Sequence, residues 1–404
     1  MAFPLNYTKS SDLAIQPERI SYNNVAYCFY NPKDITIQPF EVVKINTGIA
    51  FEMIGNHYYG QLVSKKTSFI LLGGVIDPGY RGDIIVALIN VTDKEQTIFR
   101  REVIAQCIFT PVLLPDLLQN ISNLQFHVKP TKTIESAFVP ARLEDASVGY
   151  DLHATENFNV PPLGIVEIDV GVALELKGGP FYAQIRDKSG FSTKRKLHVI
   201  NGIIDASNNN NPIIVYFQNL SREEQYIFAN EQIAQVLFLP VLLPTLRDQK
   251  GDFKNLELSF KFSKTIESAI VPKRFDENSV GYNLHAIKDV HVPPLGLAKI
   301  DTGIVLKLKG GPFYAQISEK FSPNRKFCHV INGVIESNNN NDSIVVYLKN
   351  VSMEEQHVCA NEIVAQMVFI QALLPNLIYQ EDINRNTTRG DRGFTSGICN
   401  HIYT

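Results

Sequence analysis

Short apolar runs separated by turn residues dominate the chain, and this pattern favours β-strands. Residues 165–176 (IVEIDVGVALEL) are rich in β-branched side chains and partly alternate between apolar and polar positions. Residues 213–217 (IIVYF) and 236–239 (VLFL) are shorter runs bounded by Asn, Pro or charged residues. Helical periodicity is scarce, and its best candidate is the short stretch 112–118. Many short strands joined by Gly and Pro turns predict an all-β sandwich or barrel.

One segment occurs twice almost unchanged. It reads KTIESAFVPARLEDASVGYDLHA from residue 132 and KTIESAIVPKRFDENSVGYNLHA from residue 264, and AIQPERI at 14–20 is a weaker third copy. A second marker (PVLLPDL, PVLLPTL, QALLPNL) places prolines at positions 115, 244 and 375. A period near 130 is the size of a small domain and exceeds a solenoid repeat. We therefore expect three units, at 1–118, 119–250 and 251–378, followed by a C-terminal arm at 379–404.

Composition narrows the function classes. The net charge of −3 gives no reason to expect nucleic acid or an anionic membrane as a partner. Five cysteines without a C-x-x-C pair do not favour a disulfide framework or a structural zinc site. The first residues lack the apolar core of a signal peptide, so we expect an intracellular protein, cytoplasmic or nuclear. Two RGD triplets, at 81–83 and 389–391, would indicate adhesion only in a secreted protein.

Five segments carry candidate chemistry. Residues 73–83 (GGVIDPGYRGD) lie between two apolar runs, which predicts a β-hairpin whose tip presents backbone amides, Asp77 and Tyr80. Residues 148–154 (VGYDLHA) place Asp151 on a strand, and 188–192 (KSGFS) combine a cation, a hydroxyl and a glycine turn that can cradle phosphate. Residues 230–235 (NEQIAQ) form a turn. Residues 389–397 (RGDRGFTSG) form either a loop that closes over a nucleotide or a disordered terminus.

Together and in this order, the five segments resemble the trimeric-type dUTPase (dUTP pyrophosphatase) family. That family is marked by five motifs, roughly GYDL, RSG, GxIDxxYRG, an IAQ-containing turn and RGxxGFGSTG. The resemblance covers nearly the whole chain and implies distorted jelly-roll units. In the family, three identical subunits build three sites. One subunit supplies the third motif, a second supplies motifs one, two and four, and the third lends its C-terminal arm.

The three copies differ at the motif positions. Unit 1 keeps the third motif but has Cys28 at the acid position of motif one and KKT in place of RSG. Unit 2 keeps Asp151 and the RSG-like triplet KSG, while its third motif reads DASNNNN. Unit 3 has Asn283 at the acid position and ESNNNN as its third motif, but it alone ends in the arm motif. One complete set remains, so we expect a monomeric, single-chain pseudo-trimer with one composite site.

The resemblance implies hydrolysis of dUTP to dUMP and pyrophosphate with Mg²⁺. Asp77 would deprotonate the attacking water, Asp151 would anchor Mg²⁺, and Tyr80 would pack on the deoxyribose and exclude a 2′-hydroxyl. The other implied substrate-binding residues are Gly74, Gly79 and Arg81 at the base, Lys188, Ser189, Gly190 and Gln235 at the phosphates, and Arg389, Phe394 and Ser396 in the arm.

Two departures from the family pattern keep alternatives open. Lys188 stands where the family has arginine, so a point charge replaces a bidentate fork. The arm motif is one residue shorter than FGSTG, and Thr395 takes a glycine position. A dUTPase-derived module that binds nucleotide or protein with weak or no turnover is therefore the alternative. A related deaminase acting on dCTP shares the fold, but the uracil-type hairpin and the arm motif argue against it.

Overall fold

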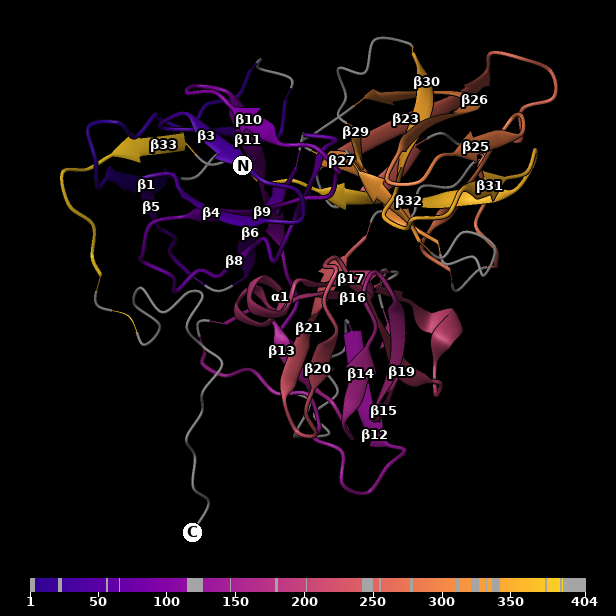
Figure 1. Ribbon diagram of the computed structural model, residues 1–404, viewed down its shortest axis with the longest axis horizontal. Coiled ribbons are helices and arrows are strands. Elements are labelled where there is room, and N and C mark those ends of the chain that lie inside the picture. Colours follow the sequence, from indigo (N-terminus) through magenta and orange to yellow (C-terminus); the bar gives the residue numbers. More distant parts are fainter. Residues whose placement is uncertain are drawn as a thin grey trace.

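Three groups of β-strands, one from each third of the chain, surround a common centre in this computed structural model (Figure 1). We use unit 1, unit 2 and unit 3 for residues 1–118, 119–250 and 251–378. The structure describes residues 4–20, 24–55, 57–64, 66–114, 126–145, 147–178, 181–200, 202–241, 250–253, 256–276, 279–309, 313–320, 327–331, 333–335, 342–374, 376–385 and 387.

The described elements are nearly all strands. In unit 1 they are β1 (Pro4–Lys9), β2 (Tyr27–Tyr30), β3 (Ile35–Ile37), β4 (Val42–Asn46), β5 (Ile49–Glu52), β6 (Tyr58–Val63), β7 (Phe69–Leu71), β8 (Val75–Ile76), β9 (Ile85–Asn90), β10 (Gln96–Ile98) and β11 (Val103–Pro111). In unit 2 they are β12 (Phe126–Lys132), β13 (Tyr150–His153), β14 (Phe158–Val160), β15 (Ile165–Gly178), β16 (Phe181–Asp187), α1 (Ser189–Arg195), β17 (Leu197–Ile200), β18 (Ile203–Ile204), the 3₁₀ turn η1 (Ala206–Asn208), β19 (Pro212–Asn219), β20 (Gln225–Ile227) and β21 (Gln232–Pro240).

Unit 3 repeats this series. Its strands are β22 (Lys250–Phe253), β23 (Leu256–Lys264), β24 (Tyr282–His285), β25 (Val290–Val292), β26 (Leu297–Lys309), β27 (Phe313–Glu319), β28 (Cys328–Ile331), β29 (Val334–Ile335), β30 (Ser343–Asn350), β31 (Gln356–Val358) and β32 (Ile363–Gln371), with β33 (Asn376–Tyr379) after them. No helix among the described residues has the length and apolar character needed to cross a membrane.

Each unit is a two-sheet sandwich. In unit 2 the sheets have strand orders β12-β15-β19-β17 and β13-β21-β16-β18, and unit 3 has the matching sheets β22-β23-β26-β30-β28, with β22 as an additional edge strand, and β24-β32-β27-β29. Unit 1 has the matching sheet β2-β11-β6-β8, facing β4-β9-β7 and β1-β5. The predicted fold class, three all-β units of jelly-roll type, is confirmed.

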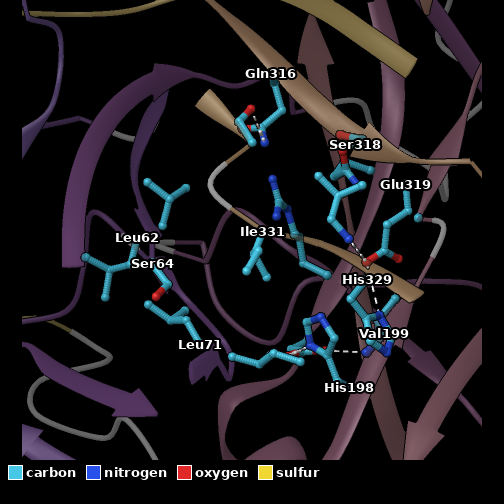
Figure 2. Close-up of a pocket in the computed structure, with 18 of the residues that line it drawn as sticks. Leu62, Ser64, Leu71, His198, Val199, Gln316, Ser318, Glu319, His329 and Ile331 are labelled. Carbon is cyan, nitrogen blue, oxygen red and sulfur yellow. Dashed lines mark hydrogen bonds and ion pairs between the residues drawn. The ribbon is translucent and has the colours of Figure 1, made fainter. Parts of the chain in front are cut away.

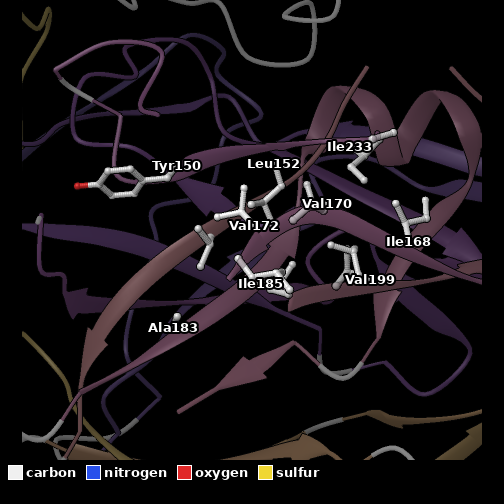
Figure 3. Packing of buried hydrophobic residues seen from close by; sticks show 14 of the residues in the cluster. Tyr150, Leu152, Ile168, Val170, Val172, Ala183, Ile185, Val199 and Ile233 are labelled. Atoms are coloured by element: carbon white, nitrogen blue, oxygen red, sulfur yellow. The ribbon is translucent and has the colours of Figure 1, made fainter. Parts of the chain in front are cut away.

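The core of unit 2 shows why the sequence pattern folds this way. Ile168, Val170 and Val172 alternate along β15 with polar or glycine positions, so they point to one face. They meet Leu152 of β13 and Ile185 of β16 between the sheets (Figure 3), and all five side chains are at most 3% exposed. Burial of each such side chain contributes about 1.5–3 kcal/mol.

Matching positions of the three units meet at the centre of the molecule. Tyr59, Tyr182 and Tyr314 are each the second residue of their strand (β6, β16, β27), are fully buried, and belong to one apolar cluster. A second cluster joins Val91, Leu220 and Val351. The chain therefore forms within itself the contacts that a trimer forms between subunits.

The recurring LLP segments connect neighbouring units. In the first, Leu113 N donates to Phe238 O of unit 2 at 2.8 Å, and in the last, Leu373 N donates to Phe109 O of unit 1 at 2.7 Å. β33 then pairs in parallel with β1, which closes the ring between the two ends of the described chain. The helix predicted at 112–118 is wrong over 112–114, where Leu113 forms an isolated bridge, and the remainder lies outside the described residues.

Candidate active site between the first two units

The loop 73–83 connects the two sheets of unit 1. As predicted, the flanking strands β7 and β9 pair antiparallel as a β-hairpin, while the short strand β8 inside the loop pairs with β6 of the other sheet. Gly74 has φ +101° and accepts Leu62 N at 2.7 Å through its carbonyl. A Cβ on Gly73, whose φ is +82°, would lie 2.6 Å from Ser189 Cβ of unit 2. Both glycines are therefore required by backbone geometry and by close approach.

Asp77 lies where this loop meets unit 2. Its carboxylate is 3% exposed, and Oδ1 accepts a hydrogen bond from Val148 N of unit 2 at 2.8 Å. Asp205 repeats the contact one unit later, accepting from Val280 N of unit 3 at 3.0 Å. The carboxylate thus has a structural role that recurs between units, and it reaches the first-motif strand of the next unit in both places.

Tyr80 and Arg81 shape the loop tip. Tyr80 OH donates to Asp83 O at 2.8 Å, which fixes the ring. Arg81 is buried, and its guanidinium donates to the carbonyls of Pro78 at 2.6 Å and Met53 at 3.0 Å. Burial lowers the pKa of Arg81, although nearby Glu52 and Tyr58 oppose the shift. The side chain of Arg81 therefore holds the loop together.

On the unit 2 side, β21 aligns the other predicted groups. Asp151 on β13 lies opposite Gln235 in the antiparallel register, and β16 pairs with the same strand and ends directly before Lys188. Lys188 Nζ lies 2.6 Å from Asp151 Oδ1 and 2.9 Å from Gln232 Oε1. The side chains of Lys188 and Asp151 are only 11% and 9% exposed, so this is a largely buried ion pair.

His153 lies two residues beyond Asp151 on β13. Burial lowers its pKa, Asp151 opposes the shift, and Lys188 adds to it. We therefore expect a neutral imidazole near pH 7.

Gln235 supports the strand that leads to Lys188. Its Nε2 donates to Asp187 O at 2.9 Å, and a Cβ on Gly149 would lie 2.0 Å from its Oε1. Gln366 makes the same contact in unit 3, donating to Glu319 O at 3.3 Å. The recurrence shows that this glutamine has a role in the fold, whichever role it has toward a ligand.

Unit 3 keeps the contacts of motifs one and two without the acid. Lys320 Nζ donates to Asn283 Oδ1 at 2.9 Å, where unit 2 has the Lys188–Asp151 ion pair. Burial lowers the pKa of Lys320, and the charge of Asp205 opposes the shift. In unit 1 Cys28 occupies the acid position, and Gln106, which corresponds to Gln235, has its Nε2 3.5 Å from Cys28 Sγ.

A segment near the C-terminus packs on the loop of unit 1. After β33, Asn384 O accepts from Arg81 Nε at 2.9 Å, Arg385 donates to Arg81 O at 3.1 Å, and Thr387 Oγ1 donates to Gly79 O at 2.6 Å. The loop, the strand ends of unit 2 and this segment therefore meet at one place. They come from three widely separated parts of the chain.

Comparison with known proteins agrees with this geometry. The dUTPase family model matches three consecutive stretches, residues 14–133, 135–261 and 267–397. The chain belongs to the dUTPase family.

Individual relatives match one unit each. The deoxyuridine 5′-triphosphate nucleotidohydrolase of Hydrogenobaculum sp. is 37% identical over 99 residues, which is 22% of this chain and 69% of the relative. The enzyme of the same name from Paramecium bursaria Chlorella virus 1 is 28% identical over 28% of this chain and 79% of the relative. Among solved structures, the dUTPase of Staphylococcus bacteriophage 80alpha with dUpNHpp is 23% identical over 28% of this chain and 94% of that chain, with a TM-score of 0.26.

The structure brings most of the predicted dUTPase residues together. The loop that carries Gly74, Asp77 and Tyr80 contacts unit 2 through Asp77 and through Gly73, which lies against Ser189, and in unit 2 Lys188 pairs with Asp151. Ser189 and Gly190 open helix α1. The arm residues Arg389, Phe394 and Ser396 lie outside the described residues. Among the described residues, no group of three or more His, Cys, Asp or Glu side chains is arranged around a metal position.

Sequence reasoning missed Asp187 and the segment 384–387. Asp187 Oδ2 accepts from Gly73 N of unit 1 at 3.1 Å and lies 2.9 Å from His198 Nδ1. One signal was available, because an acid at the end of β16 and a histidine on β17 recur in unit 3 as Glu319 and His329. For Asn384, Arg385 and Thr387 the sequence contains no comparable signal, since Asn384 accepts through its backbone carbonyl and the other two side chains donate to backbone carbonyls of the loop.

Proposed function

We propose that this chain hydrolyses dUTP to dUMP and pyrophosphate at one composite site. Unit 1 supplies the loop 73–83, unit 2 supplies the phosphate-facing strand ends, and the C-terminal segment completes the site. One observation carries the proposal. The segment that precedes the arm motif binds Gly79 and Arg81 of the same loop whose Asp77 contacts unit 2. This is the division of motifs that the dUTPase resemblance implies between three subunits.

The proposed chemistry is an in-line attack of water on the α-phosphorus. Asp77 accepts a proton from the water as the new P–O bond forms, and the bond to the bridging oxygen breaks, so that pyrophosphate leaves. The hydrogen bond from Val148 N holds one carboxylate oxygen of Asp77 in place. A fixed orientation matters because general-base catalysis depends on geometry before pKa.

Recognition of the nucleoside falls to the loop of unit 1. The Tyr80 ring is fixed through its hydroxyl, so it can offer a flat face to deoxyribose and leave no space for a 2′-hydroxyl. The positive-φ glycines keep the backbone near residue 74 accessible to a planar base. Arg81 would act through its backbone, because its guanidinium already binds three carbonyls of unit 1 and Asn384 O.

The residues present fit Mg²⁺ in the manner typical of nucleotide sites. Mg²⁺ prefers oxygen ligands and keeps several waters, with one or two carboxylates and the substrate phosphates completing its shell. Asp151 offers such a carboxylate at the phosphate side of the site, close to Lys188. A bound Mg²⁺ would neutralise phosphate charge, while Lys188, Ser189, Gly190 and Gln235 hold and orient the phosphate chain.

The ion pair between Lys188 and Asp151 also favours an alternative function, nucleotide binding with weak turnover. Asp151 and Lys188 satisfy each other at 2.6 Å, and both are nearly buried. If this pair persists on nucleotide binding, the chain would bind nucleotide with weak turnover. That is the alternative of a dUTPase-derived binding module.

Turnover of dUTP separates these functions. We expect stoichiometric pyrophosphate release from dUTP in the presence of Mg²⁺, and its loss with EDTA. Binding of a non-hydrolysable dUTP analogue without pyrophosphate release from dUTP would favour the binding module. Ammonia release from dCTP would contradict both and indicate the related deaminase.

A further inference from the structure

The centre of the molecule holds a polar cavity of about 170 Å³, lined by residues from all three units (Figure 2). Equivalent positions at the ends of β6, β16 and β27 carry Ser64, Asp187 and Glu319. Units 2 and 3 each pair their acid with a histidine on the next strand, His198 in unit 2 and His329 in unit 3. The acid of unit 2 is distinguished by an additional contact to unit 1.

Asp187 connects the two halves of the proposed site. Asp187 is buried, with 3% of the residue exposed. Its Oδ1 accepts a hydrogen bond from Val199 N at 2.7 Å, and its Oδ2 lies within hydrogen-bond distance of His198 Nδ1 and Gly73 N. Gly73 begins the loop that carries Asp77, and Asp187 directly precedes Lys188 and Ser189. One carboxylate therefore ties the loop of the general base to the start of the phosphate-binding segment.

We propose that Asp187 is a positioning residue for the composite site, and that His198 helps to hold its carboxylate toward Gly73. This inference rests on the proposed dUTP hydrolysis for its kinetic consequence. Asp187 acts through Gly73 and the strand end of β16, and it need not touch substrate.

Loss of the hydrogen bond between Gly73 N and Asp187 should displace the loop, because the loop packs closely on unit 2 at Gly73. A Cβ on Gly73 would lie 2.6 Å from Ser189 Cβ, so the loop and the phosphate-binding segment are already in van der Waals contact. Hydrogen bonds to a buried carboxylate are stronger than those between neutral groups. Displacement of reacting groups by about 1 Å can cost roughly 10²-fold in rate.

Unit 3 contains an equivalent acid and histidine pair without the contact to the loop of unit 1. His329 Nδ1 lies 3.1 Å from Glu319 Oε1, and its ring centroid lies 5.7 Å from that of His198. Glu319 also accepts from Val330 N at 3.1 Å. Glutamate thus makes in unit 3 the two contacts that aspartate makes inside unit 2. Unit 3 provides both a control residue and a precedent for substituting Asp187 by glutamate.

The test compares Asp187→Asn, Asp187→Glu and Glu319→Gln. We expect Asp187→Asn to lower kcat by about 10–10²-fold, with a smaller change in KM. The kcat values are normalised to the number of sites that bind a non-hydrolysable dUTP analogue. Asp187→Glu should recover most of that loss, and Glu319→Gln should leave kcat within about threefold. Equal loss of kcat in Asp187→Asn and Glu319→Gln would overturn the inference, because it would indicate a general structural role for both acids.

Amide exchange provides a readout that does not require activity. We expect faster exchange in peptides covering residues 69–76 of Asp187→Asn, and wild-type exchange there in Glu319→Gln. Unchanged exchange and unchanged kcat in a folded Asp187→Asn would overturn the inference. A wild-type chain without dUTP turnover, but with this exchange difference, would sink the proposed function and leave the positioning role supported. If Asp187→Asn does not fold, His198→Gln, which removes one partner of Asp187, replaces it in the comparison with Glu319→Gln, and the same losses are expected.

Discussion

Asp77 and Asp205 occupy the same position in consecutive units, and each accepts a backbone N–H of the following unit at 2.8 and 3.0 Å. Their neighbourhoods differ. Asp77 faces the strand of Asp151, whereas Asp205 faces the strand of Asn283. Because the structural contact is shared, this pair can separate a structural role from a catalytic one.

We expect Asp77→Asn to lower kcat for dUTP by at least 10²–10⁴-fold, about the contribution of a general base. Asp205→Asn should leave kcat nearly unchanged. Both variants should lose a similar free energy of unfolding, about 0.5–2 kcal/mol, because both weaken one buried hydrogen bond between units. Pyrophosphate release and urea unfolding measure the two effects. Similar kinetic losses in both variants would contradict the assignment of Asp77.

Unit 3 has a buried lysine, Lys349, where unit 2 has the neutral Gln218, and burying this charge lowers the stability of the fold. Burial lowers its pKa from 10.5 to about 8, while Asp93 of unit 1 opposes the shift, and its Nζ donates to Leu295 O at 2.6 Å. Gln218 makes the equivalent bond in unit 2, to Leu163 O at 2.6 Å, without a charge.

We expect Lys349→Gln to raise the free energy of unfolding by roughly 1–3 kcal/mol at pH 7. The sign follows from the lowered pKa. Below about pH 8 the folded protein must hold a buried ammonium, and the penalty decreases as the pH rises from about 8 toward 10.5. The advantage of the variant should therefore decrease over that range in urea unfolding. Gln218→Lys should show the opposite change, and a pH-independent difference would contradict the argument.

At the scale of elements, local pattern predicted the strands and the hairpin around the loop 73–83, but not the further pairing inside that loop. The alternation along β15 and the runs in β19 and β21 identify strands directly, because side chains on a strand alternate between faces. The loop 73–83 looked like a hairpin tip, since two apolar runs flank it. The flanking strands β7 and β9 do pair, but the loop between them also contains β8, which pairs with β6 of the other sheet, and local sequence does not encode that contact.

Helix α1 was missed for a related reason. Its sequence SGFSTKR contains serine, glycine and threonine, which are weak helix formers. The helix is supported by tertiary packing, because Phe191 is buried with its ring centroid 5.5 Å from that of Phe217. Asp187 was missed because its partner Gly73 is 114 residues away in sequence. The family motifs predict the reacting groups, whereas the contacts that would align them are long-range.

The loop 73–83 gives a prediction at this scale. Gly73→Ala places a Cβ 2.6 Å from Ser189 Cβ at φ +82°, so the loop must move away from unit 2. Gly303→Ala in unit 3 creates a similar strain, with φ +64° and a contact of 2.8 Å to Ala269 Cβ. Both variants should lose about 1–3 kcal/mol of stability.

Only Gly73→Ala should also lower kcat/KM for dUTP, by about 10–10²-fold, because only it separates Asp77 from the phosphate side. Steady-state kinetics on material that retains native far-UV circular dichroism measures this. A comparable kinetic loss in Gly303→Ala would show that strain anywhere in the molecule impairs the site, and the special position of the loop would be refuted.

At the scale of the whole molecule, covalent fusion allows the copies to diverge. A trimer of identical chains must repeat every residue three times, so an acid lost from one subunit is lost from all three sites. Here unit 1 has Cys28 and unit 3 has Asn283 at the first-motif acid position, which the proposed composite site tolerates because Asp151 of unit 2 remains. The three units nevertheless share buried central clusters, and the pairing of β1 with β33 joins the first unit to the last, as in a closed ring.

This arrangement predicts one site per chain and activity that does not depend on assembly. Calorimetric titration with a non-hydrolysable dUTP analogue should saturate at one per chain, since one set of motifs is complete. Specific activity should stay constant on dilution from micromolar to nanomolar protein, because the subunit contacts of the family are intramolecular here. A stoichiometry of three would refute the single composite site. A fall in specific activity on dilution, with stoichiometry still one, would show instead that chains must associate to complete it.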